Sequence, residues 1–423
     1  MTMFSINRAR SNRKTIVVGF DFGTHSTKVV FRERNQLNLK GRILQFDQAA
    51  EGYPRLASPS LVRCVGERLY FGTEALTRLE GTLYRSLKVD LLPGSTSRNV
   101  PPPIGMDIPM LVAAYFSWAF LKLRRRLPAE SHRDAIVHIN LAAPMSHFEN
   151  PHLKDKYLRI VQAAWKASEP SLMSIDQGIS ISEVIQVLKP LLKEPVRGSE
   201  HRHFDVLPET IAPVVSLGRE PLMEPGMYMI VDTGAGTTEM SVIYVGETGA
   251  DQKVLCYQDE TILLGGNDLH LAAGLEATEQ SAQLKKIADR LEKQLGCVWK
   301  KGYDLDKDGA PISRERWKQL TVVPSGGGTK HDEVARLLQK MRQFSSIRQW
   351  LNDSKSLKVI RHTPTTIEPG TSKEDLSLFV VANGLAIERQ RWPVRYHPEQ
   401  IEPLTSDAEV ADKPQGYWYV DAK

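Results

Sequence analysis

Short apolar runs and longer helical patterns alternate along the chain. Residues 15–31 and 229–243 share one layout, in which an apolar strand, a small polar turn and a second apolar strand follow one another. Between them, a helical pattern with a proline in its first turn covers residues 107–126. A buried strand and two more helices are predicted at 135–143, 153–168 and 181–194. This alternation predicts an α/β fold, with a sheet flanked by helices in each half.

The pattern continues after the second hairpin. A strand is predicted at 253–258 and a charged helix at 279–295, and a glycine-rich turn at 325–330 joins a strand at 320–323 to a helix at 333–350. A strand, a glycine turn and a helix in this order suit a phosphate or nucleotide site. The predicted units are a basic disordered arm, a first lobe, a second lobe and a C-terminal tail, at residues 1–14, 15–213, 214–386 and 387–423.

Composition narrows the class of protein. The 423 residues, 41% of them hydrophobic and 25% charged, are typical of a folded chain of two or three units. A net charge of +5 is too small to indicate a nucleic-acid partner. The three cysteines lie far apart without a CxxC, which excludes a disulfide framework and favours the cytoplasm. The apolar run at 110–120 is shorter than the roughly 20 residues of a membrane span, so no membrane partner is expected.

Each hairpin has an aspartate at the end of its first strand and a glycine two residues later, as expected for an internal duplication. The first tip begins at Asp21 and Gly23, and the second at Asp232 and Gly234. A magnesium nucleoside triphosphate needs backbone N–H groups and hydroxyls around its phosphates, and carboxylates that hold the hydrated metal. One tip alone is compatible with an ordinary tight turn. Two tips and a third glycine turn favour a nucleotide site in a cleft between them.

The predicted roles at the tips follow from these needs. Backbone N–H groups and hydroxyls are expected to contact phosphate at Gly23, Thr24, His25, Ser26, Gly234, Ala235, Gly236 and Thr238. His25 is expected to contribute its backbone N–H and to point its ring to solvent. Asp21, Asp232 and Glu239 are expected to hold Mg²⁺ through water.

The order of these motifs resembles the ATPase superfamily of actin, sugar kinases and the 70-kDa heat-shock chaperones. The closest resemblance is to the nucleotide-binding domain of those chaperones, from about Thr15 to Ala386. Further segments similar to that family's motifs are 57–75, 84–88, 136–144, 209–218, 265–269, 325–330 and 381–386. The resemblance implies a two-lobed actin-like ATPase fold, made of duplicated ribonuclease-H-like lobes, with ATP or ADP and Mg²⁺ as cofactors.

The resemblance also implies roles for single residues. Lys88 matches the family's lysine that reaches the γ-phosphate and the attacking water, and Glu209 matches the glutamate that orients that water or the metal's water shell. With them, Asp21, Asp232 and Thr237 complete the expected catalytic set. Nucleotide contacts are also implied for Gly266, Gly326, Gly327, Gly328 and Lys330, and for Lys293 in the helix that matches the adenine-clamping one.

Some segments depart from the family pattern. Thr210 and Pro213 alter the segment after Glu209, and Glu292 stands where the adenine-clamping helix has a lysine, so residues 289–296 are also compatible with a plain solvated helix. The stretch from Gly266 to Gly326 is short, which predicts a reduced outer subdomain in lobe two. The residues after Ala386 are too few for the family's peptide-binding domain.

These features lead to one hypothesis and three alternatives. The hypothesis is an ATP-binding, slowly hydrolysing switch whose closure is read by a separate, unidentified protein partner. The alternatives are an actin-like filament former of the plasmid-partition type, a small-molecule kinase, and a pseudo-ATPase that binds nucleotide without turnover. Two further segments stay open: the aromatic segment 415–420 suits a partner or the parent lobe, and the basic run 124–126 suits the helix dipole or an acidic partner.

Overall fold

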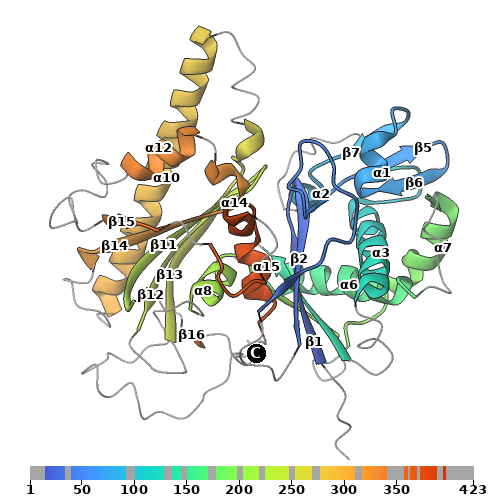
Figure 1. The fold of residues 1–423 in the computed structure, drawn as a ribbon, viewed down its shortest axis with the longest axis horizontal. Coiled ribbons are helices and arrows are strands. Elements are labelled where there is room, and N and C mark those ends of the chain that lie inside the picture. The colour runs from blue at the N-terminus through green and yellow to red at the C-terminus, as the bar shows by residue number, and fades with distance from the viewer. Residues whose placement is uncertain are drawn as a thin grey trace, which may run out of the picture.

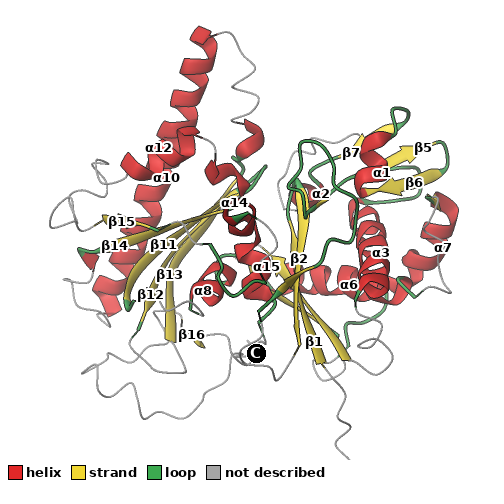
Figure 2. Ribbon diagram, viewed as in Figure 1, coloured by secondary structure: helices red, strands yellow, loops and turns green. Residues whose placement is uncertain are grey.

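The structure is a computed structural model of a mixed α/β protein (Figures 1 and 2). It describes residues 15–33, 40–91, 101–127, 136–143, 150–169, 178–197, 203–218, 224–246, 253–268, 277–309, 317–330, 332–340, 357–360, 363–368, 372–387 and 394–396. The predicted basic arm at 1–14 lies outside these residues. No helix in the described ranges has the length and apolar character needed to span a membrane.

The N-terminal sheet begins with the first predicted hairpin. Strands β1 (Thr15–Phe22) and β2 (Ser26–Glu33) pair antiparallel, and their tip register joins Asp21 to Lys28. The strand order is β10-β8-β1-β2-β3, with β4 also paired to β2. The added strands are β3 (Arg42–Ile43), β4 (Ser58–Pro59), β8 (Ile136–Ala143) and β10 (Phe204–Pro208), of which β8 and β10 run parallel to β1.

The C-terminal sheet repeats this arrangement around the second hairpin. Strands β11 (Gly226–Thr233) and β12 (Thr238–Val245) pair antiparallel, and the tip register joins Asp232 to Glu239. The strand order is β15-β14-β11-β12-β13-β16. The added strands are β13 (Lys253–Ile262), β14 (Leu320–Ser325), β15 (Leu357–Val359) and β16 (Val394–Tyr396). Because β14 and β15 run parallel to β11 while β13 is antiparallel to β12, five strands have the same order and direction in both sheets.

A third, smaller sheet lies beside the N-terminal one. Its strands β7 (Thr82–Tyr84), β5 (Val62–Val65), β6 (Arg68–Phe71) and β9 (Ile179–Ser180) pair antiparallel in that order. Three short helices adjoin it along the chain: α1 (Gly72–Thr77), α2 (Leu87–Asp90) and α7 (Ile181–Leu191). Helix α2 follows β7 of this small sheet and carries Lys88, which lines the same cavity as the two hairpin tips. This lysine is the contribution of the region to the site.

Helices α3 (Ile108–Arg126) and α6 (Pro151–Ala167) cover the N-terminal sheet (Figure 2). The α3 helix starts as its sequence predicts, because the Asp107 side chain accepts a hydrogen bond from the Met110 N–H at 2.8 Å. The Phe116 and Phe120 rings of α3 pack edge-on against the Phe20 ring of β1, with centroid distances of 5.5 and 5.2 Å. These aromatic contacts fix the helix against the strand that carries Asp21.

The helix α10 (Ala277–Gly309) is longer than its sequence predicts. The predicted end at Leu295 precedes Gly296, a residue that weakens helices by about 1 kcal/mol. The helix continues because the buried Trp299, one and two turns after Leu295 and Leu291, packs against Trp317 at a centroid distance of 4.9 Å. Helix α12 (Asp332–Lys340) covers the start of the helix predicted at 333–350, whose last ten residues lie outside the described ranges.

Two helices from the middle and the end of the chain lie between the large sheets (Figure 1). They are α8 (Ala212–Leu217) and α15 (Val380–Leu385), which follows α14 (Lys373–Leu376) and the turn η4 (Ser377–Phe379). Their contact is close, because a Cβ on Gly384 would lie 1.9 Å from the Ala212 carbonyl oxygen, and one on Gly19 of β1 would lie 2.0 Å from that of Ala382. The Asn140 amide on β8 also donates to the Leu385 carbonyl at 2.7 Å.

We expect Gly384→Ala to lower the free energy of unfolding by about 1–3 kcal/mol, because the added methyl group overpacks the contact between α15 and α8. Urea denaturation followed by far-UV circular dichroism measures this change. Gly226→Ala is the matched control, since no atom lies within 4 Å of the Cβ it would add. Equal effects of the two substitutions would contradict the packing described for the two helices.

Candidate functional site

The two hairpin tips line a cavity of about 600 Å³. Segments from both large sheets and from the helices between them meet there. The predicted site residues that line it are Asp21, Gly23, Thr24, His25, Ser26, Lys88, Glu209, Asp232, Gly234, Ala235, Thr237, Glu239, Gly266, Gly326, Gly327 and Gly328. The structure therefore brings the whole expected catalytic set, and all three expected metal-binding carboxylates, to one place.

Three predicted residues, Gly236, Thr238 and Lys293, do not line the cavity, and the side chain of a fourth, Lys330, is not among those that the structure describes. A Cβ on Gly236 would lie 3.0 Å from side-chain carbons of Thr24 and Val89, so this glycine marks a contact between the two tips. The Thr238 hydroxyl donates to the Leu264 carbonyl at 2.8 Å and points away from the cavity. Lys293 is an exposed side chain on α10, and Lys330 is the last residue of the turn η2 (Gly327–Lys330).

A buried ion pair joins Lys88 to Glu209 at the centre of the site. The two side chains are 4% and 10% exposed, and the lysine ammonium donates to a carboxylate oxygen of the glutamate. Burial by itself lowers the pKa of Lys88, but the negative charges of Glu209, Glu239 and Asp21 outweigh it and raise that pKa. Lys88 is therefore a cation at every physiological pH, held in a fixed position by its carboxylate partners.

The negative charges of the two carboxylates at the second tip, Asp232 and Glu239, are only partly neutralised by nearby cations. Asp232 and Glu239 lie opposite each other in the hairpin register, an arrangement that is unfavourable for two like charges. Burial, followed by the charges of Glu209 and Asp21, raises the pKa of Asp232 to about 7. Burial and the charge of Glu209 raise the pKa of Glu239 well above its ordinary value. Within the described part of the chain, no donor gives a hydrogen bond to either oxygen of the Glu239 carboxylate, and its contact with the Glu209 side chain also favours the protonated form.

The first tip differs in one position. Where the second tip places Glu239 opposite its aspartate, the first places Lys28, whose ammonium donates to Asp21 at 2.8 Å. The cavity is thus lined by four carboxylates and two lysine ammonium groups among the described residues. No three Asp, Glu, His or Cys side chains in those residues are grouped closely enough to hold a metal directly. The water-mediated role of Asp21, Asp232 and Glu239 toward Mg²⁺ stays a prediction.

Close backbone packing builds the glycine-rich part of the cavity. A Cβ on Gly326, whose φ is +80°, would lie 2.2 Å from an Asp232 carboxylate oxygen, and one on Gly328 would lie 2.5 Å from the Thr233 methyl carbon. The Gly266 and Asn267 N–H groups donate to the carbonyls of the second tip at 2.8 and 2.7 Å. The later turns are therefore fixed against this tip, and their glycines are required by contact with it.

Gly234 has more room than these glycines. The nearest atom to a Cβ added there is the Thr237 carbonyl oxygen at 3.4 Å, an ordinary van der Waals distance. Because Gly234 also lines the cavity, a side chain at this position would extend into the space that a ligand needs, while the backbone around it stays unchanged. This makes Gly234 a better probe of the site than Gly236.

Sequence reasoning missed the loop that includes Tyr53. The His25 ring, expected to face solvent, instead stacks on the Tyr53 ring with centroids 4.1 Å apart, and its Nε2 lies 3.2 Å from the Gly52 carbonyl oxygen. Burial, and then the positive charges of Lys28 and Arg85, lower the pKa of His25. The ring therefore stays neutral at pH 7 and forms part of the wall. Lys28 was also missed, although its position opposite Asp21 follows from the hairpin register.

We expect Asp232→Asn to gain stability relative to the wild type as the pH rises from 5 to 8. The folded-state pKa of about 7 lies above the ordinary 3.8, so the folded protein binds the proton more tightly and loses stability as the pH rises through this window. The loss is on the order of a few kcal/mol and is absent without the carboxylate. Urea denaturation at both pH values measures it, with the half-exposed Asp155→Asn as control. Wild-type stability that rises relative to the Asp232 variant would contradict this.

A comparison with models of known protein families finds none that matches this chain, and a comparison with curated proteins also finds no match.

Proposed function

We propose that this chain is an ATP-binding and ATP-hydrolysing switch with a two-lobed actin-like fold, of the kind its motifs resemble. One observation carries the proposal: two hairpins with the same register, from two sheets with the same strand order, direct Asp21 and Asp232 into one cavity that also holds Lys88 and Glu209. A structural duplication that meets at its loops favours a ligand clasped from both sides.

The cavity suits a nucleotide in size and chemistry. A volume of about 600 Å³ lies within the range of small-molecule sites. Its walls offer glycine backbone from three turns and hydroxyls from Thr24, Ser26 and Thr237, which are the groups that bind phosphate oxygens. Its four carboxylates would repel a polyphosphate alone. A bound Mg²⁺ supplies the positive charge that reconciles the phosphates with Asp21, Asp232 and Glu239.

The two residues of the central ion pair, Lys88 and Glu209, have different roles in the proposed reaction. Lys88 is a permanent cation that is positioned before any ligand arrives, so it stabilises negative charge that develops on a transferring phosphoryl group. Glu209 lines the cavity beside it and orients a water through its carboxylate, with no covalent intermediate. Thr237 offers its hydroxyl from the second tip. Water attacks the γ-phosphorus, the bond from that phosphorus to the bridging oxygen breaks, and ADP and inorganic phosphate leave as the products.

Binding would couple to the position of the two sheets. A ligand held by both tips favours the arrangement in which the tips are close, and the contacts of α8 with α15 lie between the same two sheets. Nucleotide state would therefore set the relative position of the sheets, and a separate protein would read it. The cytoplasm, where ATP and Mg²⁺ are abundant, is a compartment that suits this proposal.

We expect Gly234→Val to weaken Mg²⁺–ATP binding by at least about 100-fold, because the side chain fills ligand space without a backbone clash. Isothermal titration calorimetry with Mg²⁺–ATP measures the affinity. Gly226→Val is the matched control, placed at the start of β11, the strand that Gly234 directly follows, and thermal denaturation of both variants verifies that they fold. A folded Gly234→Val protein that binds ATP as tightly as the wild type would refute the proposed phosphate site.

We expect Lys88→Ala to change ATP affinity no more than a few-fold but to reduce turnover by about 100-fold or more, because the ammonium acts mainly in the transition state. Release of inorganic phosphate measures turnover. The substitution leaves Glu209 buried without its cation, so a loss of stability is also expected. The pair Lys88→Met with Glu209→Gln removes both charges and should restore stability but not turnover. Unchanged turnover in Lys88→Ala would remove this lysine from the mechanism.

A further inference from the structure

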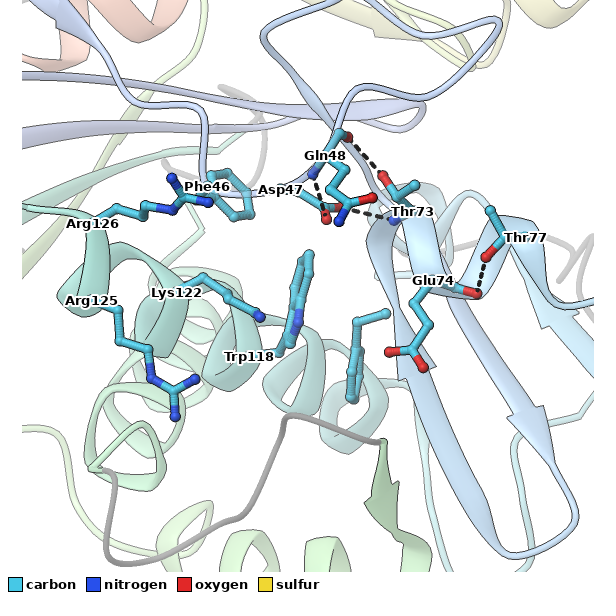
Figure 3. A pocket seen from close by; sticks show the side chains of 11 residues that line it. Phe46, Asp47, Gln48, Thr73, Glu74, Thr77, Trp118, Lys122, Arg125 and Arg126 are labelled. Carbon is cyan, nitrogen blue, oxygen red and sulfur yellow. Dashed lines mark hydrogen bonds between the residues drawn. The ribbon is translucent and has the colours of Figure 1, made fainter.

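Figure 3 shows a second cavity, of about 420 Å³. It is formed where the C-terminal half of α3 meets the helix α1 and the segment that contains Phe46 and Asp47. Its lining shares no residue with the cavity between the hairpin tips. Whatever occupies it is therefore distinct from the proposed nucleotide.

The inner wall of this cavity is a rigid aromatic cluster. Trp118 packs on Phe71 in a stacked arrangement and on Phe46 edge-on, with centroid distances of 5.8 and 5.7 Å. The three side chains are at most 5% exposed, so their positions are fixed by the core around them. Gly72, with a φ of +57°, allows this approach, since a Cβ there would lie 2.5 Å from the Trp118 ring. The hollow beside this cluster is therefore preformed and can accept a flat apolar side chain.

Basic side chains line one side of the hollow. They project from the last turns of α3 and lie in Figure 3 on the side of Trp118 opposite to Thr73 and Glu74: Lys122, Arg125 and Arg126. The neighbouring Arg124 does not line the hollow. It pairs with Glu169 at 2.9 Å and stacks over the Trp165 ring at 3.8 Å, on another face of the helix. The basic run thus has two roles, one in packing and one in lining the hollow.

The carboxylates in the lining have partners within the protein. Asp47 accepts hydrogen bonds from the Thr73 N–H at 2.8 Å and from the Ser58 hydroxyl at 3.0 Å. Glu74 pairs with Arg78 at 2.8 Å, and that guanidinium lies over the Tyr70 ring. Counted together with Arg78, the charged side chains at the hollow are four cations and two carboxylates, so the mouth is basic overall and attracts a negatively charged segment that carries an aromatic side chain.

We propose that the occupant is the C-terminal segment of this same chain, with Trp418 in the hollow and the acidic stretch before it along the basic side chains. Residues 398–412 contain five acidic residues and no lysine or arginine, and the segment 417–421 reads Tyr-Trp-Tyr-Val-Asp. This combination complements an aromatic wall and a basic mouth. The proposal is independent of nucleotide binding.

The length of the segment is sufficient. The last described strand, β16, ends at Tyr396, 22 residues before Trp418. Such a stretch reaches about 70 Å when extended, which exceeds the diameter of roughly 55 Å expected for a globular chain of this size. Because the segment is tethered to the same chain, its concentration at the cavity is higher than that of a separate peptide, which favours occupancy by contacts too weak to hold a free peptide.

Site-specific photo-crosslinking in the full chain tests the proposal. Trp418→p-benzoylphenylalanine is irradiated, and the crosslinked peptides are identified by mass spectrometry. We expect crosslinks within one chain to residues 46–48, 73–77 and 118–126. Adding Arg125→Glu and Arg126→Glu to the photoreactive variant should reduce the yield of these crosslinks at least about five-fold. The matched charge reversal Lys189→Glu with Lys193→Glu, at exposed positions near the end of α7, should leave the yield unchanged.

Three outcomes would overturn the proposal. Products of twice the chain mass would place the segment on a second copy, crosslinks to other surfaces would place it elsewhere, and no crosslink at the cavity would leave the cavity without this occupant. Mg²⁺–ATP binding, measured on the same variants, should be unaffected by either charge reversal. Failure of this proposal and failure of the proposed function therefore give different results.

Discussion

The arrangement of the candidate site depends on a buried lysine surrounded by more carboxylates than it can neutralise. Lys88 pairs with Glu209, while Asp232 and Glu239 remain buried with raised pKa values. A buried carboxylate without hydrogen-bond donors lowers stability, by about 1–3 kcal/mol or more. Replacing such groups by apolar residues would stabilise the fold, so their presence calls for a reason outside folding. The Mg²⁺ that we propose between the tips would supply that reason, since it would interact favourably with the same oxygens that are unfavourable in its absence.

Duplicated secondary structure, more than any single loop, places these charges together. Both hairpins turn at the same register, and five strands follow in the same order and direction in each large sheet. The sheets are held near each other by α8 and α15, which touch at Gly384 and reach β1 at Gly19. Contacts this close leave α8, α15 and β1 little freedom to shift relative to one another. A change in the distance between the tips would therefore move whole sheets, which is the property that a nucleotide-controlled switch requires.

The features that the sequence predicts well are those with local causes. The hairpins follow from apolar strands separated by small polar turns, and the start of α3 follows from Asp107 and its proline. Features that depend on distant contacts were missed. The α10 helix passes Gly296 because Trp299 packs on Trp317, and Val394–Tyr396, inside the predicted tail, forms a strand because β13 offers it an edge. In the site, Tyr53 was missed because its partner His25 is 28 residues earlier in the chain.

Net charge conceals how charge is arranged in this molecule. The sum of +5 is small for 423 residues, yet among the described residues the central cavity is lined by twice as many carboxylates as lysines, and the cavity beside α3 is lined by three basic and two acidic side chains. Burial makes the central excess unfavourable unless a cation is bound, whereas the basic mouth beside α3 is open to solvent and salt weakens its field. The two cavities should therefore respond differently to ionic strength. Occupancy beside α3 should fall as salt rises, while the buried charges between the tips should change little.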